Sequence, residues 1–417
     1  MTPAFLEIDN SRVDAASSPN VSRGVLSALT LGYVALLPYQ FEVAYRINFS
    51  PADVLLLLAF LLAVGRLKYC QPAWSVWHFA IAMTFVMGSL VAAMRVGTVD
   101  AFELLHKDAG LLLPVLSYMV FTSCIGGWDD LRRILRVFVI GVVVENTVAV
   151  AVFLVSYFFH ISDPFARYGL RLSGTMLDPN AYGGLLAAAL VICEGASWGR
   201  VPLFTGWALW FVRVTLSLGL LFTFSRSAWV AVAIGFLLLS VFRFRVALRF
   251  LTATLVGAPL LFLFMGNRFV PIFEVMASRP QQVQGRFDLI RDAFELFRHH
   301  PLLGGGIGSF RLSEGEVAHN SAMWFLADFG VIGFTVFLGF VAWFFAKGWY
   351  AYRFAPEREQ PLVLGLLAGH AAMLGLAMGI EAFYQRHWWL VFALIAASYS
   401  LVRRRVDAVS LAGGVWQ

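Results

Sequence analysis

The chain has 417 residues, of which 60% are hydrophobic and only 13% charged, and its mean hydropathy is +0.76. Soluble domains carry roughly 25% charged residues, so this composition excludes an ordinary soluble fold and predicts an all-α membrane protein. The formal net charge of +6 comes from basic residues spread between apolar segments. We therefore expect membrane lipids, and no nucleic acid, among its partners.

Three cysteines, Cys70, Cys124 and Cys193, lie in apolar segments or at their ends. They form neither a CxxC motif nor a metal-ligand spacing. The sequence therefore predicts no disulfide framework and no metal site, and we expect no cofactor.

Twelve apolar segments are long enough to cross roughly 30 Å of hydrocarbon as helices. They fall at about 24–41, 50–65, 74–94, 108–125, 134–159, 180–195, 203–223, 227–242, 246–266, 319–346, 362–380 and 387–402. We treat 24–402 as one transmembrane domain with tails at 1–23 and 403–417. The first tail lacks the basic region, short apolar core and cleavage site of a signal peptide.

The distribution of basic residues predicts on which side the tails lie. With both termini inside, the inner segments hold seventeen basic residues and the short outer loops hold seven. Those seven are Arg46, Arg95, Lys107, Arg167, Arg171, Arg226 and Arg386. Because short loops follow the positive-inside rule, we predict a multi-pass protein of the inner membrane with two cytoplasmic tails.

One long outer segment, 267–318, separates the ninth and tenth spans. Its part Gly285–His300 carries apolar side chains at helical spacing, which predicts an amphipathic helix at the membrane surface. Those side chains are Phe287, Ile290, Phe294 and Phe297. The glycine-rich stretch 301–310 follows, and its glycines allow a tight turn and a close backbone approach.

Arg226 lies in a short outer turn between two apolar segments. An arginine there is costly unless it snorkels to the headgroups or finds an anion. The hydroxyl groups of Thr223, Ser225 and Ser227 would supply further donors to a phosphate. A lipid headgroup anchor is the alternative.

His319 and Asn320 stand at the start of the tenth span, just after the glycine-rich stretch. The pKa of a histidine is near neutral, which suits a general base that acts on a hydroxyl. A purely structural histidine is the alternative.

Further polar residues are expected on the same outer side, each with a structural alternative. Arg286 and Arg291 lie in the predicted amphipathic helix, where a solvated face would also explain them. Asp178 and Asn180 begin the sixth span, downstream of Arg171, and both residue types also cap helices.

Three other charged residues leave alternatives open. Glu381 and Arg386 bracket the last outer turn, where they are also able to pair with each other. Arg213 lies in the middle of the seventh span, and deep charges of this kind face a bundle interior or a water-filled cavity.

Several arginines and one histidine on one side suit a diphosphate-bearing lipid, because guanidinium groups bind phosphate through paired hydrogen bonds. No acidic cluster suggests bound Mg²⁺, so we predict a metal-independent group transfer driven by electrostatics and positioning. The predicted catalytic residues are His319, Arg226 and Arg286. The predicted substrate-binding residues are Arg171, Asp178, Asn180, Arg291, Asn320, Glu381 and Arg386.

A family resemblance appears in the same residues. His319-Asn320, nine residues, Gly330, two residues and Gly333 resembles the H[NSQ]-x9-G-x-x-[GTY] signature of the O-antigen ligase and polymerase superfamily of integral-membrane C-type glycosyltransferases. The stretch 285–310, the turn around Arg226 and the Asp178-Pro-Asn loop are similar to that family's segments in the same order.

The resemblance runs from about Arg171 to Trp389, with one departure. The family's R-x3-L pattern would begin at Arg286, but Ile290 stands at its last position. This substitution is conservative.

The resemblance implies a lipopolysaccharide O-antigen ligase or a near relative of the bacterial inner membrane. Such enzymes transfer a glycan from undecaprenyl diphosphate to a sugar hydroxyl on the periplasmic face, where the ligases use lipid A–core as acceptor. It further implies that Arg226 and Arg286 hold the diphosphate. His319 would activate the acceptor hydroxyl or orient the phosphates.

Two other functions stay open. A polymerase of O-antigen or exopolysaccharide would use the same donor with another repeat unit as acceptor. A transporter or flippase is disfavoured because the sequence shows no pair of Gly/Pro-broken spans in corresponding halves. Arg213 inside a span is the observation that favours transport.

Overall fold

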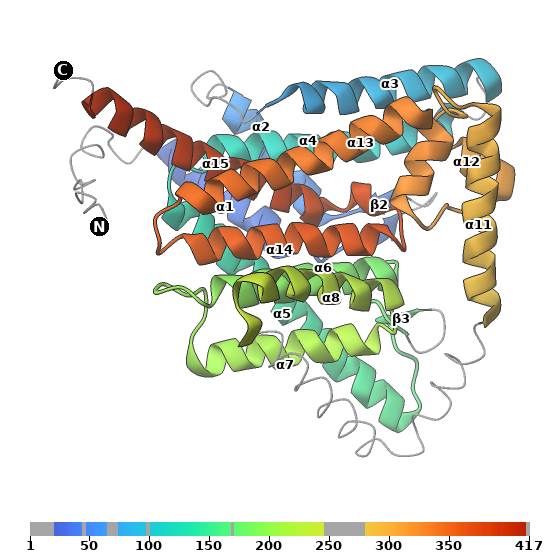
Figure 1. Cartoon of the computed structure of the whole chain (residues 1–417). Helices are drawn as coiled ribbons and strands as arrows, with labels where there is room; N and C mark the ends of the chain where they lie inside the picture. The colour runs from blue at the N-terminus through green and yellow to red at the C-terminus, as the bar shows by residue number, and fades with distance from the viewer. Residues whose placement is uncertain are drawn as a thin grey trace.

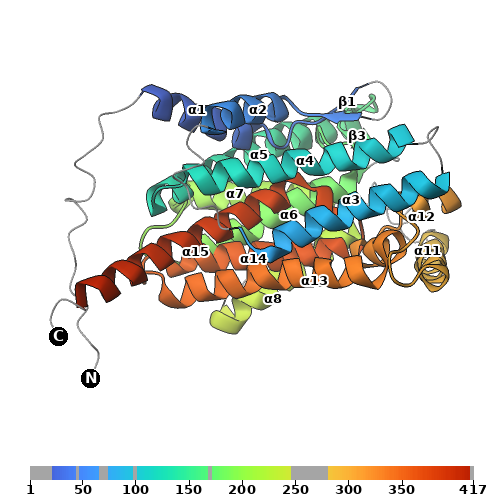
Figure 2. The same ribbon diagram turned by 90° about the horizontal axis from the view of Figure 1, so that it is seen from above.

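The computed structural model describes residues 21–43, 47–64, 74–96, 101–167, 171–245 and 280–413. Most helices lie side by side in a bundle, and one helix, α11, runs across an end of it (Figure 1). In Figure 2, α1 and α2 lie along one edge of this bundle, and α13 and α8 lie along the opposite edge.

The described helices and strands follow one another along the chain in three groups. The first group is α1 (Val21–Leu36), β1 (Phe41–Val43), β2 (Ile47–Phe49), α2 (Pro51–Val64), α3 (Val76–Val96), α4 (Ala101–Cys124) and α5 (Trp128–Phe159). The second is β3 (Ala166–Arg167), β4 (Arg171–Leu172), α6 (Pro179–Ala196), α7 (Gly206–Phe222) and α8 (Arg226–Phe242). The third is α11 (Pro280–His299), α12 (Ser309–Glu314), α13 (Ser321–Phe354), α14 (Gln360–Ala377), the 3₁₀ helix η4 (Ala382–Tyr384) and α15 (Arg386–Gly413).

Eleven of the twelve predicted apolar segments coincide with a helix, and the ninth, 246–266, lies outside the described residues. Four described helices are long and apolar enough to cross a membrane, namely Val76–Arg95, Trp128–Phe159, Ser321–Phe354 and Gln360–Ala377. Five further apolar helices have 10–17 residues. The chain is therefore a helical membrane protein, while twelve spans and cytoplasmic termini stay predictions.

The all-α prediction is confirmed, and two short antiparallel hairpins connect helices within this fold. The predicted span 24–41 was too long: α1 ends at Leu36, and Phe41 pairs with Phe49 across β1 and β2. Pro38 explains this end, since proline lacks the N–H that would continue a helix and restricts the residue before it. The second hairpin pairs Arg167 of β3 with Arg171 of β4.

Helix α6 occupies the centre of the molecule. Every residue from Pro179 to Ala196 is buried, and α6 packs against α14, α8, α7 and α5. Its many small side chains allow this close helix packing, as in other membrane bundles. The start of α6, which carries Asp178 and Asn180, is therefore fixed relative to its neighbours.

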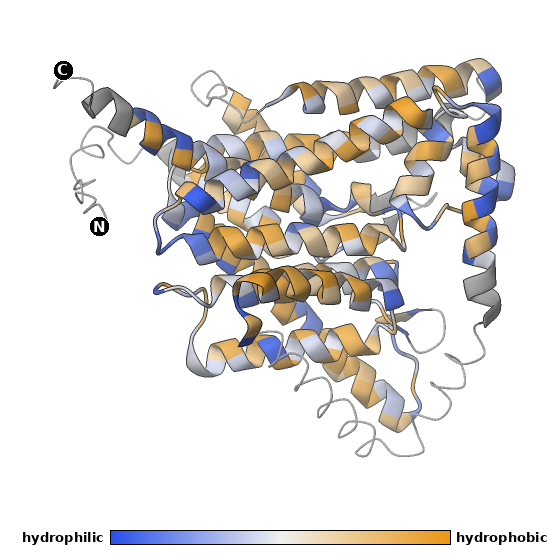
Figure 3. Ribbon diagram, viewed as in Figure 1, coloured by the Kyte–Doolittle hydropathy of each residue, from blue (hydrophilic) through white to orange (hydrophobic). Residues whose placement is uncertain are grey.

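The predicted amphipathic helix exists as α11, which begins at Pro280, five residues earlier than expected. Ala293 is fully buried, and Leu289 and Leu296 pack on the core, so these residues face the bundle. Phe287 and Phe294 of the predicted apolar stripe are 64% and 49% exposed. Figure 3 shows polar residues along α11 beside the largely apolar bundle. Its place at a membrane surface stays a prediction.

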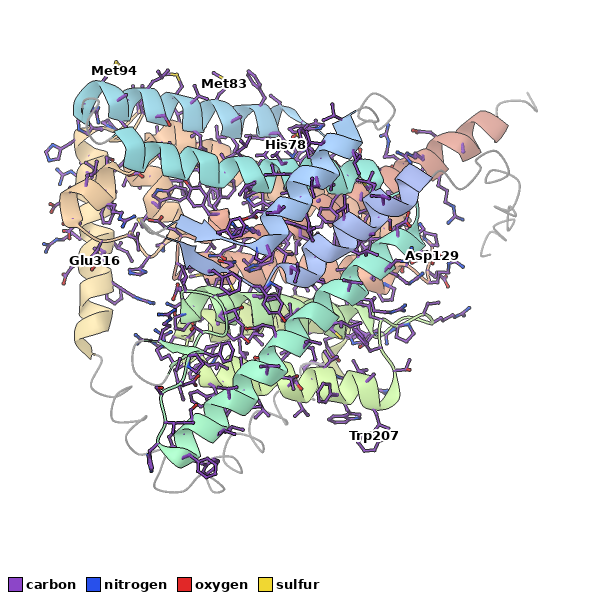
Figure 4. The ribbon with its side chains drawn as sticks, turned by 180° about the vertical axis from the view of Figure 1, so that it is seen from behind. His78, Met83, Met94, Asp129, Trp207 and Glu316 are labelled. Atoms are coloured by element: carbon purple, nitrogen blue, oxygen red, sulfur yellow. The ribbon has the colours of Figure 1, made fainter. Side chains whose placement is uncertain are left out.

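The predicted catalytic residues belong to one end of the bundle, the end that α11 crosses. Figure 4 shows Glu316, after α12, at the end that α11 crosses, and Asp129, in the first turn of α5, at the far end. The elements that carry the predicted catalytic residues meet at the α11 end (Figure 1).

Candidate active site

A cavity of about 280 Å³ brings together the three predicted catalytic residues. Arg226, Arg286 and His319 line it, with the apolar side chains of Phe287, Ile290, Ala318 and Met378. These residues come from the start of α8, the first turns of α11, the segment before α13 and the turn after α14. The fold therefore joins basic groups that lie up to 93 positions apart in sequence.

Arg226 is presented by a tight turn of three residues between α7 and α8. Phe224 in this turn has a φ of +46°, and Ser225 caps α8 by accepting a hydrogen bond from the Ala228 N–H at 3.3 Å. Ser225 is fully buried, whereas Arg226 is exposed. The side chain of Arg226 makes no hydrogen bond or ion pair with any described residue. The partial positive charge of the α8 N-terminus adds to its own charge.

Three predicted substrate-binding residues support this turn through hydrogen bonds. Arg171 donates from Nε to the Thr223 carbonyl at 3.0 Å and from Nη2 to Asn180 Oδ1 at 2.8 Å. The Ser225 hydroxyl donates to the same Asn180 oxygen at 2.9 Å. Asp178 is the N-cap of α6 and accepts from the Asn180 N–H at 2.9 Å. The helix-cap interpretation of Asp178 is therefore confirmed.

Arg286 lies half-buried in α11 and faces a second positive charge. Burial lowers the pKa of Arg286, the nearby charge of Arg226 lowers it further, and Asp178 opposes both effects. The side chain of Arg286 makes no hydrogen bond or ion pair with any described residue. Two neighbouring guanidinium groups repel each other, and an anion between them relieves this repulsion. Ile290, one helical turn further on, lines the same cavity and keeps the apolar character of the R-x3-L pattern.

His319 has a φ of +48°, in the left-handed region that non-glycine residues seldom adopt. Such strained backbone is concentrated at functional sites. Burial lowers the pKa of His319, and the charge of Arg286 lowers it further, against the opposing charges of Asp178, Glu381 and Glu316. The imidazole is therefore neutral at physiological pH and able to accept a proton.

A set of hydrogen bonds fixes the segment that carries His319 against the turn after α14. Glu381 Oε1 accepts from the Ala318 N–H at 3.2 Å, and the Asn320 side chain donates to the Met378 carbonyl at 3.3 Å. The Ser321 hydroxyl donates to the Ile380 carbonyl at 2.9 Å. Asn320 also caps α13. Glu381 and Asn320 thus lie beside the cavity and hold its histidine in place.

Asp328 supports the site and was missed by the sequence analysis. It is fully buried in α13 and accepts from the Gly308 N–H at 2.7 Å, the Phe310 N–H at 3.0 Å and the Trp324 indole at 2.8 Å. These bonds fasten the glycine-rich turn to α13. A carboxylate inside an apolar span, two residues before Gly330, is the signal that would have identified it.

Gly330 of the signature marks a kink in α13. Its φ of +66° breaks the helix, and a Cβ there would overlap the Leu302 carbonyl. The Val331 N–H beyond the kink donates to the Pro301 carbonyl at 2.9 Å. The kink at Gly330 and this hydrogen bond therefore join α13, which His319 precedes, to the segment that follows α11 and Arg286.

The match with a known family falls on these elements. Residues 211–338 match the model of the O-antigen ligase family. The matched range contains Arg226, Arg286, His319 and Gly330, and it confirms the resemblance seen in the sequence. No curated protein matches the chain significantly. The match supports a membrane glycosyltransferase of the ligase or polymerase type and does not distinguish the two.

Two predicted substrate-binding residues lie away from the cavity. The side chain of Arg291 is 72% exposed and lies 3.8 Å from carboxylate oxygens of Asp292 and Glu295, so it does not line the cavity. Arg386 donates to both carboxylate oxygens of Asp53, on α2, at 2.8 and 2.6 Å. The pairing of Arg386 with Glu381 alone was therefore wrong.

Arg213, in the middle of α7, has a structural partner. Arg213 donates from Nε and Nη2 to the two carboxylate oxygens of Glu194, on α6, at 2.8 and 2.9 Å. Its guanidinium carbon also lies 5.7 Å from the centre of the Trp210 ring. This pairing accounts for the residue that had favoured a transporter.

Metal ions in proteins are bound mainly by His, Cys, Asp and Glu side chains. In the part of the chain that the structure describes, no three His, Cys, Asp or Glu side chains are grouped to hold a metal ion. Cys124 and Cys193 take part in no disulfide there, and Cys70 lies outside the described residues.

Proposed function

We propose that the protein is a lipopolysaccharide O-antigen ligase of the bacterial inner membrane. It transfers a glycan from undecaprenyl diphosphate to a sugar hydroxyl of lipid A–core on the periplasmic face. The observation that carries this proposal is the joint lining of one cavity by Arg226, Arg286 and His319. The family match over these three residues supports it.

The two arginines act on the donor. Each guanidinium group offers paired N–H donors to phosphate oxygens, and neither has a protein partner among the described residues. As the bond between the anomeric carbon and the diphosphate oxygen breaks, the electron pair leaves with the diphosphate. The arginines stabilise this growing negative charge, so they supply the counter-charge without a metal ion.

His319 acts on the acceptor. Its lowered pKa leaves a neutral imidazole, which takes the proton of the acceptor hydroxyl as that oxygen bonds to the anomeric carbon. The cavity holds both reactants within one small volume, which favours the encounter. One displacement then yields the glycosylated acceptor and undecaprenyl diphosphate.

Reconstitution of the purified protein in liposomes tests this function. The liposomes contain undecaprenyl-diphosphate glycan and rough lipopolysaccharide, with chelator present and without ATP. Glycan on lipid A–core supports the ligase. Lengthening of the lipid-linked glycan alone would support the polymerase instead, and neither product, with movement of the donor across the bilayer, would overturn both enzyme assignments.

A further inference from the structure

Glu145 lies on α5 and does not line the catalytic cavity. Its side chain is 3% exposed, and its Oε1 accepts from the Thr175 N–H at 2.8 Å while its Oε2 lies 2.7 Å from the Tyr182 hydroxyl. None of the ion pairs among the described residues involves Glu145. A buried carboxylate without a cation is costly, so this environment favours the neutral acid.

The hydrogen-bond pattern around Tyr182 requires one additional proton. The Tyr182 oxygen also lies 2.9 Å from Asn146 Oδ1, and this amide orientation is set because Asn146 Nδ2 donates to the Thr215 carbonyl at 2.7 Å. A phenol carries a single proton and cannot donate to both the carboxylate and the amide oxygen. If Glu145 is protonated, its Oε2 donates to the Tyr182 hydroxyl and Tyr182 donates to Asn146, so both contacts of the Tyr182 hydroxyl are satisfied.

The hydrogen bonds of Glu145 hold the loop 171–178, which leads to the active site. Thr175 lies between Arg171 and Asp178, and its hydroxyl also donates to the Pro38 carbonyl at 2.9 Å. Gly174 has a φ of +56°, and a Cβ there would overlap Glu145 Oε1, so the loop backbone lies directly against the carboxyl group. The position of residues 171–178 in turn sets the Arg171 contacts that support the Arg226 turn.

We propose that Glu145 is a positioning residue, held as a neutral carboxylic acid inside the bundle, that fixes loop 171–178 and thereby the Arg226 side of the cavity. This role rests on the proposed function for its effect on transfer. The ionisable groups that face Glu145 are the phenols of Tyr182, from α6, and Tyr39, after α1. Both are neutral near pH 7, so the carboxyl group has no compensating charge from either element.

Infrared spectroscopy of the purified protein tests the protonation directly and needs no activity. The wild type at pH 7 should show the carbonyl stretch of a protonated carboxyl group, shifted in D₂O and absent from Glu145→Gln. Glu295→Gln is the matched control, because that carboxylate is 60% exposed on α11 and should leave the band unchanged. Identical spectra for the wild type and Glu145→Gln would overturn the proposal.

Transfer assays test the positioning. Glu145→Gln, which keeps one donor and one acceptor, should retain transfer within about twofold. Glu145→Ala should lower kcat by at least about tenfold, because a displacement of about 1 Å in a site can cost on the order of 10²-fold. Full transfer by a folded Glu145→Ala variant would overturn this role.

A third measurement keeps the proposal testable if Glu145→Ala does not fold. Raising the pH should ionise Glu145 and reduce transfer by the wild type more than by Glu145→Gln; parallel profiles would contradict it. Absence of transfer by the wild type would instead overturn the proposed ligase function and leave the infrared result standing.

Discussion

Two arginines that lie thirteen positions apart, Arg213 and Arg226, occupy opposite situations. Arg213 sits inside a helix and directs two nitrogen atoms at the carboxylate of Glu194. Arg226 begins the next helix, has no hydrogen bond or ion pair with the described residues, and faces the cavity. Arg386, paired with Asp53, resembles Arg213. An arginine held by a carboxylate is part of the framework, whereas one left without a partner at a cavity is available to an anionic ligand.

The largest loss of activity is expected from substitution of His319, which lines the same cavity as Arg226 and Arg286. His319→Ala should lower kcat/KM by about 10²–10⁴-fold, because proton transfer to a positioned base contributes that much. Initial rates of transfer to lipid A–core measure it. His319→Asn separates chemistry from backbone strain, since asparagine tolerates a positive φ. Either variant with wild-type rates would remove the histidine from the reaction.

The next effect concerns the free arginine itself. Arg226→Lys should reduce transfer by about tenfold or more, because a lysine ammonium cannot reproduce the paired donors of a guanidinium group. The melting temperature should stay near that of the wild type, since the Arg226 side chain makes no hydrogen bond or ion pair with the described residues. An unimpaired variant would favour a lipid headgroup anchor.

The framework arginine should respond in the opposite way. Arg213→Ala leaves the buried Glu194 without its cationic partner and should lower the free energy of unfolding by on the order of 1–3 kcal/mol. Transfer per folded molecule should change little. Thermal melting and rates are compared with Arg213→Ala/Glu194→Gln, which should recover part of the stability. A large loss of transfer with unchanged melting would assign Arg213 to the substrate instead.

The smallest effect is a shift of the pH profile. The pKa of His319 is lowered by burial and by Arg286, so the imidazole becomes protonated only as the pH falls below the ordinary histidine value of about 6.5. Transfer should therefore be maintained at neutral pH and decline in acid. Arg286→Gln, slower overall, should move this decline to higher pH because one positive charge is gone. An unmoved profile of kcat/KM would show that Arg286 does not act on the histidine.

The sequence predicted the helices and the three cavity residues because hydropathy, short turns and the signature are local patterns. It did not predict which charges pair: Arg386 and Asp53 are 333 positions apart, and nothing near either residue indicates the other. It also placed Arg291 at the substrate together with Arg286, because both lie on one helix and the side of that helix that faces the bundle depends on the packing of Leu289 and Ala293. Asp328 was missed because its partners lie in a turn before the span.

The glycine-rich stretch 301–310 bonds to α13 beside the kink at Gly330 and fastens the C-terminal end of α11 there. Arg286 lies thirteen residues before His299, the last residue of α11, at a distance of about 20 Å along the helix axis. With an arm of that length, a tilt of about 3° at the fastened end displaces Arg286 by about 1 Å. Because about 1 Å at a reacting centre can cost on the order of 10²-fold in rate, substitutions at Asp328 or Gly330 should change diphosphate binding by leverage, without touching the ligand.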